Sequence, residues 1–193
     1  RRGVRIFVVT EVPANYASDY PQANFLKVVD SLESLQRLAE RHRDEFNIPI
    51  VGITGSNGKT MVKEWLNQLL SDDLFVTRSP RSYNSQVGVP LSVWLLNEHS
   101  QVGVFEAGIS QPGEMLALRD IIQPTIAVLT NLGDAHQENF VSREAKCKEK
   151  LVLFHDAKIV VYNGDDSLIS DCVNALEDFR GERLYWSCSD HNA

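Results

Sequence analysis

The chain has 193 residues, enough for one sizeable hydrophobic core, and its composition of 43% apolar and 23% charged residues is ordinary for a globular protein. Its formal net charge of −7 argues against a nucleic acid or an anionic membrane surface as the partner. No apolar run is long enough to span a bilayer, no signal peptide is recognisable, and the three cysteines form neither a metal-ligand spacing nor a paired disulfide set. We therefore expect a cytoplasmic protein with reduced thiols.

The first 48 residues differ in pattern from the rest. Two short runs, 4–9 and 24–29, are rich in β-branched and aromatic residues and predict strands, and the prolines between them predict a polar loop. Asp30 and Glu33 have the spacing of a capping box, and leucines then recur with a helical period to about Phe46. We expect residues 1–48 to be the end of a preceding domain and a linker helix, and residues 49–193 to form a second domain.

In the second domain, runs that predict strands alternate with amphipathic stretches that predict helices. The expected strands are 50–54, 74–77, 101–107, 125–130, 158–162 and 183–186, and the expected helices follow the first strand and cover 89–97, 114–122, 142–155 and 167–176. This alternation predicts an α/β fold with a mostly parallel sheet and helices on both faces. Ligands bind beyond the carboxyl ends of strands in such sheets, so the residues after each strand are the candidate site.

The strand at 50–54 runs into a glycine-rich turn, Gly55-Ser56-Asn57-Gly58-Lys59-Thr60, which an amphipathic stretch follows. The glycines let backbone N–H groups approach an anion, and the helix directs the positive end of its dipole to the same place. Lys59 adds a charge for the outer phosphates of a nucleotide, and the Thr60 hydroxyl is a ligand for Mg²⁺. A glycine-rich turn can be a purely structural loop, but its combination with the strand, Gly-Lys-Thr and the helix favours phosphate binding.

Polar residues also follow the later strands. Glu106 ends the strand that begins at residue 101, and Asn131 and His136 follow the strand that begins at residue 125. Because Mg²⁺ prefers oxygen ligands, Glu106 is a candidate metal ligand, although a helix-capping or salt-bridged glutamate gives the same pattern. His136 is either a ligand or a hydrogen-bonded loop histidine. We expect these residues to converge with the glycine-rich turn on one crevice.

Four segments in this order resemble the motifs of the ATP-dependent Mur ligases: Thr-Gly-Ser-Asn-Gly-Lys-Thr, the segment around Asn84 that reads Tyr-Asn-Ser-Gln-Val-Gly-Val-Pro, Glu106-Ala-Gly, and Asn131-Leu-Gly-Asp-Ala-His. Ile53 stands where a general phosphate loop has its first glycine, and the resulting shorter spacing is also typical of this family. The resemblance covers about residues 50–166 and is closest to the MurF type, including its branch fused to alanine racemase.

The resemblance implies an ATP-dependent amide-bond ligase of peptidoglycan precursor synthesis. Such an enzyme adds D-Ala-D-Ala to UDP-MurNAc-tripeptide through an acyl phosphate. Residues 1–48 would then end an N-terminal UDP-substrate domain, and residues 49–193 would be an incomplete central ATP-binding domain with little turnover of its own.

The resemblance also implies the residues that bind the nucleotide. Gly55, Ser56, Asn57, Gly58, Lys59 and Thr60 would hold the ATP phosphates, and Asn131 would line the nucleotide side of the crevice. Asn84 would face the γ-phosphate and the substrate.

Two Mg²⁺ ions would be held by Thr60, Glu106, His136 and a carbamylated Lys150. A carbamate would turn the lysine cation into an anionic oxygen ligand, which Mg²⁺ prefers. Most lysines in this charged helix are expected to be solvated, and a small error in spacing would select Lys148 instead. The catalytic residues implied are Lys59, Asn84, His136 and Lys150.

The chain departs from the MurF pattern at a few positions. Ser85 stands where a second asparagine is usual, Arg81-Ser82 replaces Gly-Asn, and Val152 replaces a glutamate. These departures leave another Mur ligase or a folylpolyglutamate synthase as alternatives with the same chemistry. A non-catalytic phosphate-loop module is a further alternative, although such a module would not need Glu106, His136 and Lys150 together.

Overall fold

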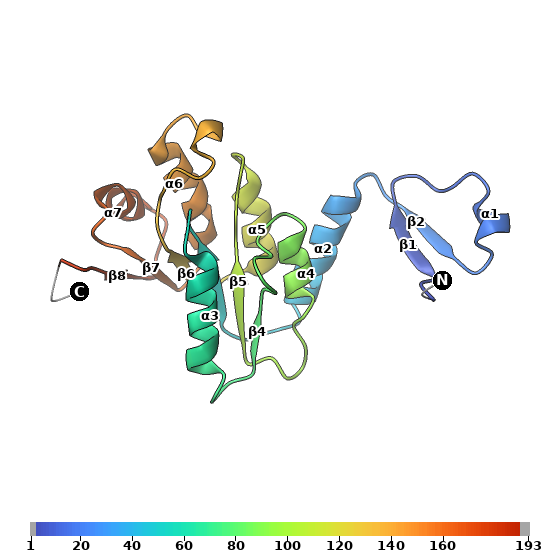
Figure 1. Cartoon of the computed structure of the whole chain (residues 1–193), viewed down its shortest axis with the longest axis horizontal. Helices are drawn as coiled ribbons and strands as arrows, with labels where there is room; N and C mark the ends of the chain where they lie inside the picture. Colours follow the sequence, from blue (N-terminus) through green and yellow to red (C-terminus); the bar gives the residue numbers. More distant parts are fainter. Residues whose placement is uncertain (1–2, 190–193) are drawn as a thin grey trace.

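The computed structural model describes residues 3–189, so the outermost residues of both predicted domains, 1–2 and 190–193, lie outside it. Its body is built on a six-stranded sheet with the strand order β4-β5-β3-β6-β7-β8 (Figure 1). The strands are β3 (Ile50–Thr54), β4 (Val76–Arg78), β5 (Val102–Glu106), β6 (Ile126–Leu129), β7 (Ile159–Asn163) and β8 (Glu182–Trp186). All neighbouring strands are parallel, which confirms the predicted α/β fold.

The strand order reverses beside β3. The chain runs from β3 outward to β4, returns to β5 on one side of β3, and then crosses to β6 on its other side. Ile53 pairs with Glu106 of β5, and Thr54 pairs with Leu129 of β6, so the three strands end at the same level. Residues that follow β3, β5 and β6 therefore meet at the crevice where open parallel sheets bind their ligands.

Helices cover the two faces of the sheet unequally. They are α2 (Ser31–Arg43), α3 (Lys59–Leu70), α4 (Gly88–Val93), α5 (Glu114–Ile122), α6 (Arg143–Leu151) and α7 (Ser167–Asn174). Side chains from α2, α4, α5, α6 and α7 share one large buried cluster with the sheet. On the opposite face, Val62 and Leu66 of α3 pack on a small cluster of Val51, Ile53 and Val104.

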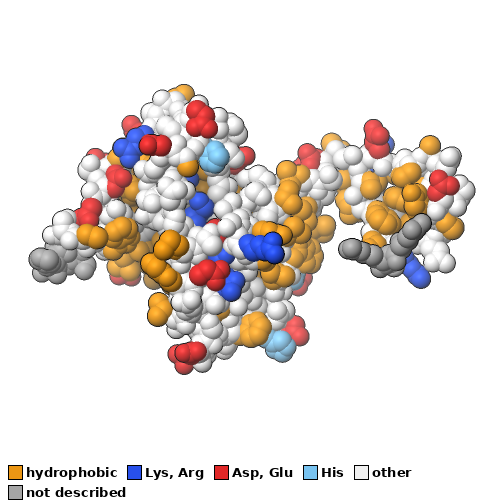
Figure 2. Space-filling view, in the orientation of Figure 1, with side chains coloured by type: hydrophobic (Ala, Val, Ile, Leu, Met, Phe, Trp, Pro, Cys, Tyr) orange, Lys and Arg blue, Asp and Glu red, His pale blue; other side chains and the backbone are white. Residues whose placement is uncertain are grey.

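A small unit precedes the body. The strands β1 (Ile6–Val9) and β2 (Asn24–Lys27) form a parallel pair, and this pair lies apart from the large sheet, beyond the start of α2 (Figure 1). The connecting segment contains a short helix, α1 (Tyr16–Asp19), where the sequence predicts only a loop. Apolar side chains gather on this unit (Figure 2), and those of Ile6 and Leu26 are exposed.

Helix α2 packs on the body, against α4 and α5. Its last residue, Arg43, is buried and donates hydrogen bonds to the carbonyl oxygens of Ile122 and Gln123, at 3.0 and 3.1 Å. These bonds satisfy carbonyl groups at the end of α5, which have no partner within that helix. The linker helix of the sequence prediction thus packs on the body, and its last residue is bonded to the end of α5.

Several helix boundaries differ from the sequence prediction. Helix α4 ends at Val93, and the expected 142–155 helix is α6 followed by a separate 3-10 turn, η2 (Val152–Phe154). A second 3-10 turn, η1 (Gln137–Asn139), lies in the predicted loop after β6. None of the helices within residues 3–189 combines the length and the apolar character needed to cross a membrane.

Candidate active site

The glycine-rich turn after β3 is held in shape by the residues that follow β6. Gly55 and Gly58 have positive φ angles of 139° and 82°, and a Cβ atom on Gly55 would lie 2.0 Å from Thr130 Oγ1. Thr130 Oγ1 donates to the carbonyl oxygen of Asn57 at 2.5 Å, and Asn131 Oδ1 accepts from the backbone N–H of Asn57 at 2.9 Å. The turn is therefore preformed, and Gly55 is required by both its backbone angle and its close packing.

Helix α3 begins directly after this turn. Its N-cap residue is Gly58, which has no side chain to accept the first backbone N–H groups of the helix. These N–H groups and the helix dipole make the end of α3 suitable for an anion. Lys59 Nζ donates to the carbonyl oxygen of Gly55 at 2.8 Å and so lies over the turn. Burial lowers the pKa of Lys59, and the nearby Glu106 carboxylate opposes that shift.

The predicted catalytic residues share one cavity. Lys59, Asn84, His136 and Lys150 line a space of about 170 Å³ together with Gly55 and other residues of the strand ends. These residues come from α3, the segment before α4, the segment after β6, and α6, so the fold brings together positions far apart in the sequence. The predicted convergence of the strand-end segments is thus present in the structure.

Neither Glu106 nor Thr60 lines this cavity, but the fully buried side chain of Glu106 contacts Asn84, which does. Its Oε2 atom accepts a hydrogen bond from Thr60 Oγ1 at 3.1 Å and a long one from Asn84 Nδ2 at 3.4 Å. Its Oε1 atom lies 3.0 Å from the ammonium nitrogen of Lys63. The salt-bridged glutamate that the sequence left as an alternative is therefore present, and the second carboxylate oxygen still faces Thr60.

Lys63 is a residue that the sequence reasoning missed. Its side chain is fully buried, and it contacts both Glu106 and Glu64. A signal was available, because Lys63 shares a helical face with Leu66 and Leu70 and follows Lys59 by one turn. A lysine within the apolar stripe of an amphipathic helix is expected to need a buried partner.

Lys150 is only 2% exposed, whereas the side chain of Lys148 is 63% exposed and pairs with Glu144. Burial, with help from the charges of Lys59 and Lys146, lowers the pKa of Lys150 to about 8. Among the ion pairs of residues 3–189, none includes Lys150. Of the two lysines that the spacing allowed, Lys150 is thus the one that lines the cavity.

The segment that presents His136 is held by α6. Lys146 is buried and donates to the carbonyl oxygen of Gly133 at 2.6 Å, and Arg143 donates to that of Leu132 at 3.1 Å. Burial lowers the pKa of Lys146, while Asp134 and Glu138 oppose the shift. His136 itself is exposed and has a left-handed backbone with φ of 59°. Lys146 is the second residue that sequence reasoning missed.

The side chains present fit a metal that is bound together with phosphate groups. Within residues 3–189, no group of three His, Cys, Asp or Glu side chains could hold a metal ion by itself. Mg²⁺ in nucleotide sites is commonly held by one or two protein ligands and by substrate phosphates. The Thr60 hydroxyl and the buried Glu106 carboxylate form such a pair beside the preformed turn.

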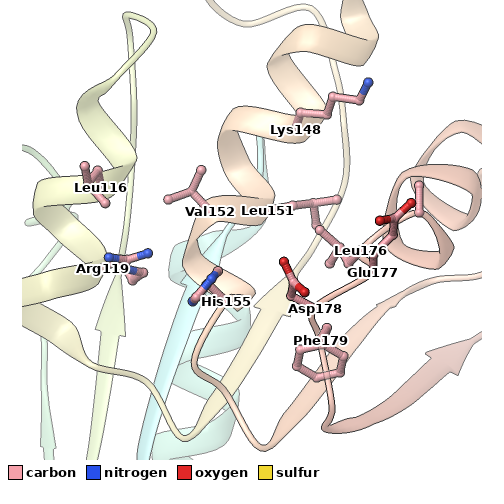
Figure 3. Close-up of a pocket in the computed structure, with 11 residues that line it drawn as sticks. Leu116, Arg119, Lys148, Leu151, Val152, His155, Leu176, Glu177, Asp178 and Phe179 are labelled. Carbon is pink, nitrogen blue, oxygen red and sulfur yellow. The ribbon is translucent and has the colours of Figure 1, made fainter.

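A larger cavity of about 550 Å³ lies elsewhere, between α5, α6 and the segment after α7 (Figure 3). It is lined mainly by apolar groups such as Leu116, Leu176 and Phe179. The predicted site residues do not line it. We therefore assign the candidate active site to the smaller cavity, where polar groups from three strand ends converge.

Comparison with known proteins identifies the family. Residues 53–193 match the Mur ligase middle domain. The chain belongs to the Mur ligase family. The UDP-N-acetylmuramoyl-tripeptide–D-alanyl-D-alanine ligase of Bacillus subtilis is 33% identical over 147 residues, which are 75% of this chain and 32% of that ligase. The crystal structure of the MurF ligase from Thermotoga maritima in complex with ADP aligns with a TM-score of 0.81 at 30% identity, over 95% of this chain and 41% of that one.

Folylpolyglutamate synthase has a similar fold at much lower sequence identity. The enzyme of Mycobacterium tuberculosis aligns with a TM-score of 0.62 at 14% identity, which is a likeness of fold alone. The MurF-type resemblance of the sequence is therefore confirmed over the synthase alternative. The present Mur ligase chain spans about a third of the length of the curated relative from B. subtilis.

Proposed function

We propose that this chain supplies the ATP- and Mg²⁺-binding site of an ATP-dependent amide-bond ligase. The observation that supports it most is the cluster of Thr60, Asn84 and the buried Glu106 beside a preformed phosphate loop. A module that only bound nucleotide would gain nothing from a buried carboxylate beside the phosphate loop and an unpaired buried lysine in the neighbouring cavity. The similar MurF ligase of T. maritima forms a complex with ADP, which supports nucleotide binding by this chain as well.

The proposed substrates follow from the names of the relatives. We propose that the whole protein joins D-Ala-D-Ala to UDP-MurNAc-tripeptide in peptidoglycan precursor synthesis, in the cytoplasm. A carboxylate oxygen of the tripeptide would bond to the γ-phosphorus of ATP while the bond to the bridging oxygen breaks and ADP leaves. The amine of D-Ala-D-Ala would then attack the acyl phosphate, and phosphate and a proton would leave.

Both reactants in the first step are negatively charged, so the protein must bring them together. The N-terminus of α3 and Lys59 would bind the phosphates, and Asn84 would face the γ-phosphate and the carboxylate. Thr60, Glu106, His136 and a modified Lys150 would hold two Mg²⁺ ions, which neutralise charge between the reactants when bound. Asn131 would act through the phosphate loop, because its side chain holds Asn57.

We also propose that Lys150 is carbamylated. A pKa of about 8 leaves a substantial fraction of the amine neutral at physiological pH, and only the neutral amine can attack CO₂. A nitrogen–carbon bond would form, a proton would be released, and the product would be an anionic carbamate. The modification would also remove an unpaired buried cation from the protein.

The domain assignment is part of the same proposal. The β1–β2 unit would belong to the end of the UDP-substrate domain, and α2 would connect it to the ATP-binding domain that begins near residue 49. The separation of the small sheet from the large one supports this division (Figure 1).

Calorimetric titration of this chain with ADP and Mg²⁺ tests the nucleotide site. We expect Mg²⁺-dependent binding that Lys59→Ala lowers by roughly 10–100-fold, because a partly buried cation aimed at the phosphates is lost. Lys148→Ala, which removes an exposed lysine of the same helix as Lys150, is the matched control. Equal affinity for ADP in Lys59→Ala and Lys148→Ala would contradict the proposed nucleotide site.

The substrates are tested with the whole protein. Phosphate release should require both UDP-MurNAc-tripeptide and D-Ala-D-Ala, and a folate with glutamate should not replace them. The opposite preference would favour the synthase alternative.

A further inference from the structure

We infer that Lys63 is a positioning residue that aims the Glu106 carboxylate at the metal and phosphate site. This inference rests on the proposed function, because it gives Glu106 the role of a Mg²⁺ ligand. Lys63 Nζ lies 3.0 Å from Glu106 Oε1, and both side chains have no exposed surface. Nothing in the family comparison or the sequence motifs assigns a role to this lysine.

Three oxygen atoms of the protein surround the Lys63 ammonium group. Besides its ion pair with Glu106, it lies 3.1 Å from Glu64 Oε1 and donates a hydrogen bond to the carbonyl oxygen of Arg81. Its charge is therefore directed at groups of the protein itself. Lys63 is thus not placed to bind phosphate, unlike Lys59, which lies one helical turn away over the phosphate loop.

The contact between Lys63 and Glu106 Oε1 determines which groups the other carboxylate oxygen, Oε2, can contact. With Oε1 held by Lys63, Oε2 is the atom that meets Thr60 Oγ1 and Asn84 Nδ2. A carboxylate on a single-bonded stem can rotate, and rotation would move Oε2 away from Thr60. The buried ion pair prevents this rotation, because a rotated Glu106 would leave the Lys63 charge without its partner.

Lys63 also holds the segment that precedes α4. Arg81 has a left-handed backbone with φ of 49°, a conformation that favours glycine, and its carbonyl oxygen points to Lys63. The next residue, Ser82, lies 3.2 Å from Thr60 through its hydroxyl oxygen, and Asn84 follows two positions later. One ammonium group therefore joins α3, the end of β5 and the segment that carries Asn84.

The charges around Lys63 determine how its removal would change the affinity of the site for Mg²⁺. Two carboxylates, Glu106 and Glu64, face it, and Arg78 pairs with Glu64 at 3.3 Å. If Lys63 served only to neutralise Glu106, its loss would leave a more negative site and would strengthen cation binding. If Lys63 positions Glu106, its loss would weaken Mg²⁺ binding despite the extra negative charge. The two roles therefore predict changes of opposite sign.

The experiment measures the Mg²⁺ dependence of ADP binding in wild type, Lys63→Met and Lys63→Arg, at fixed ADP with increasing Mg²⁺. We expect Lys63→Met to raise the Mg²⁺ concentration needed for half-maximal binding by roughly 10–100-fold, as for other residues that orient metal ligands. Lys63→Arg should recover much of the affinity, because it keeps a cation and several donors. Binding of ADP without Mg²⁺ should be unchanged, and Lys148→Met is the matched control.

The outcomes separate the two proposals. Wild-type protein that binds ADP without any response to Mg²⁺ would contradict the proposed function itself. Wild-type protein that responds to Mg²⁺, with Lys63→Met responding equally well or better, would overturn only the positioning role. Circular dichroism checks that each variant is folded. If Lys63→Met does not fold, Lys63→Gln, which keeps an N–H donor but no charge, takes its place with the same two readings.

Discussion

Two regions near the cavity each contain a buried lysine, and the two lysines differ in whether they have an ion-pair partner. On the side of α3 and β5, Lys63 is fully buried and ion-paired with an equally buried Glu106. On the side of α6, Lys150 is 2% exposed, and no ion pair among residues 3–189 includes it. The charge of Lys63 is balanced by carboxylates, whereas the charges of Lys59 and Lys146 act on Lys150 and lower its pKa further.

This difference indicates two different uses of burial. A buried ion pair keeps both groups charged and fixes their orientation, which suits a residue that must present one oxygen to a metal. A buried lysine without a partner has a lowered pKa and a reactive neutral amine, which suits a residue that is to be modified. Removing the partner of Lys63 should therefore lower the free energy of unfolding, whereas removing Lys150 should raise it.

The largest effect is expected for Glu106→Gln on the side of α3 and β5. This change keeps the shape of the side chain but leaves the Lys63 charge with only Glu64, which is partly exposed. Removing one partner of a buried pair costs about 3–5 kcal/mol, and we expect the free energy of unfolding at pH 7 to fall by an amount in this range. Urea denaturation of the two proteins measures it. Glu64→Gln is the control, and an equal loss in that variant would mean that Glu106 is not the main partner.

On the other side, Lys150→Met should have the opposite sign. Each unit of pKa shift corresponds to 1.36 kcal/mol, so a lysine whose pKa falls to about 8 destabilises the protein while it is charged, and its removal should add about 1–3 kcal/mol at pH 7. The comparison uses buffers free of CO₂, so that the amine is not modified. Lys148→Met should leave the stability unchanged within error. A clear loss of stability in Lys150→Met would show that the ammonium group has a partner.

The stability gained in Lys150→Met should depend on pH. The pKa of Lys150 is lowered from 10.5 to about 8, so between these values the unfolded chain binds more protons than the folded one. Stability from this group therefore rises with pH, and its penalty is complete below pH 8 and disappears near pH 10.5. Burial raises the pKa of Cys147, which acts in the opposite direction in alkaline solution in both proteins. The Lys150 charge lowers the pKa of Cys147, so the experiment is done in a Cys147→Ala background, where the stability difference between Lys150→Met and its parent should shrink toward zero from pH 8 to 10.5.

Addition of bicarbonate tests directly whether Lys150, the buried lysine without an ion pair, is modified. If Lys150 forms a carbamate, ¹³C-labelled bicarbonate should give a carbamate signal in the ¹³C spectrum of wild type. Lys150→Met should lack this signal, and Lys148→Met should keep it. A signal that survives in Lys150→Met would assign the modification to another amine.

The sequence was sufficient to predict the fold, and its motifs located the segments that follow the strands. Alternation of apolar runs and amphipathic stretches predicted the parallel sheet, and strand ends predicted where Glu106 and Asn131 lie. The burial of Lys63 and Lys146 was not predicted. Lys63 does share a helical face with Leu66 and Leu70, which is a signal for a buried position, whereas Lys146 lies in a charged helix where only burial distinguishes it from its neighbour Lys148. The turns around Arg81 and η1 also depend on contacts made across the site, which no local pattern contains.

The smallest effect is expected for Asn131→Ala, which tests whether this residue touches the nucleotide or shapes the loop. Its side chain accepts a hydrogen bond from the N–H of Asn57 at 2.9 Å, at an exposed position where water can replace it. The loss in stability should therefore be about 0.5–1 kcal/mol. Because Thr130 still holds the carbonyl of Asn57, the loop should keep its shape, and the affinity for ADP should fall by less than about tenfold, which corresponds to 1.4 kcal/mol. Calorimetric titration with ADP measures this. A much larger loss of affinity with unchanged stability would show that Asn131 contacts the nucleotide directly, whereas equal losses in both mean that it acts through the loop.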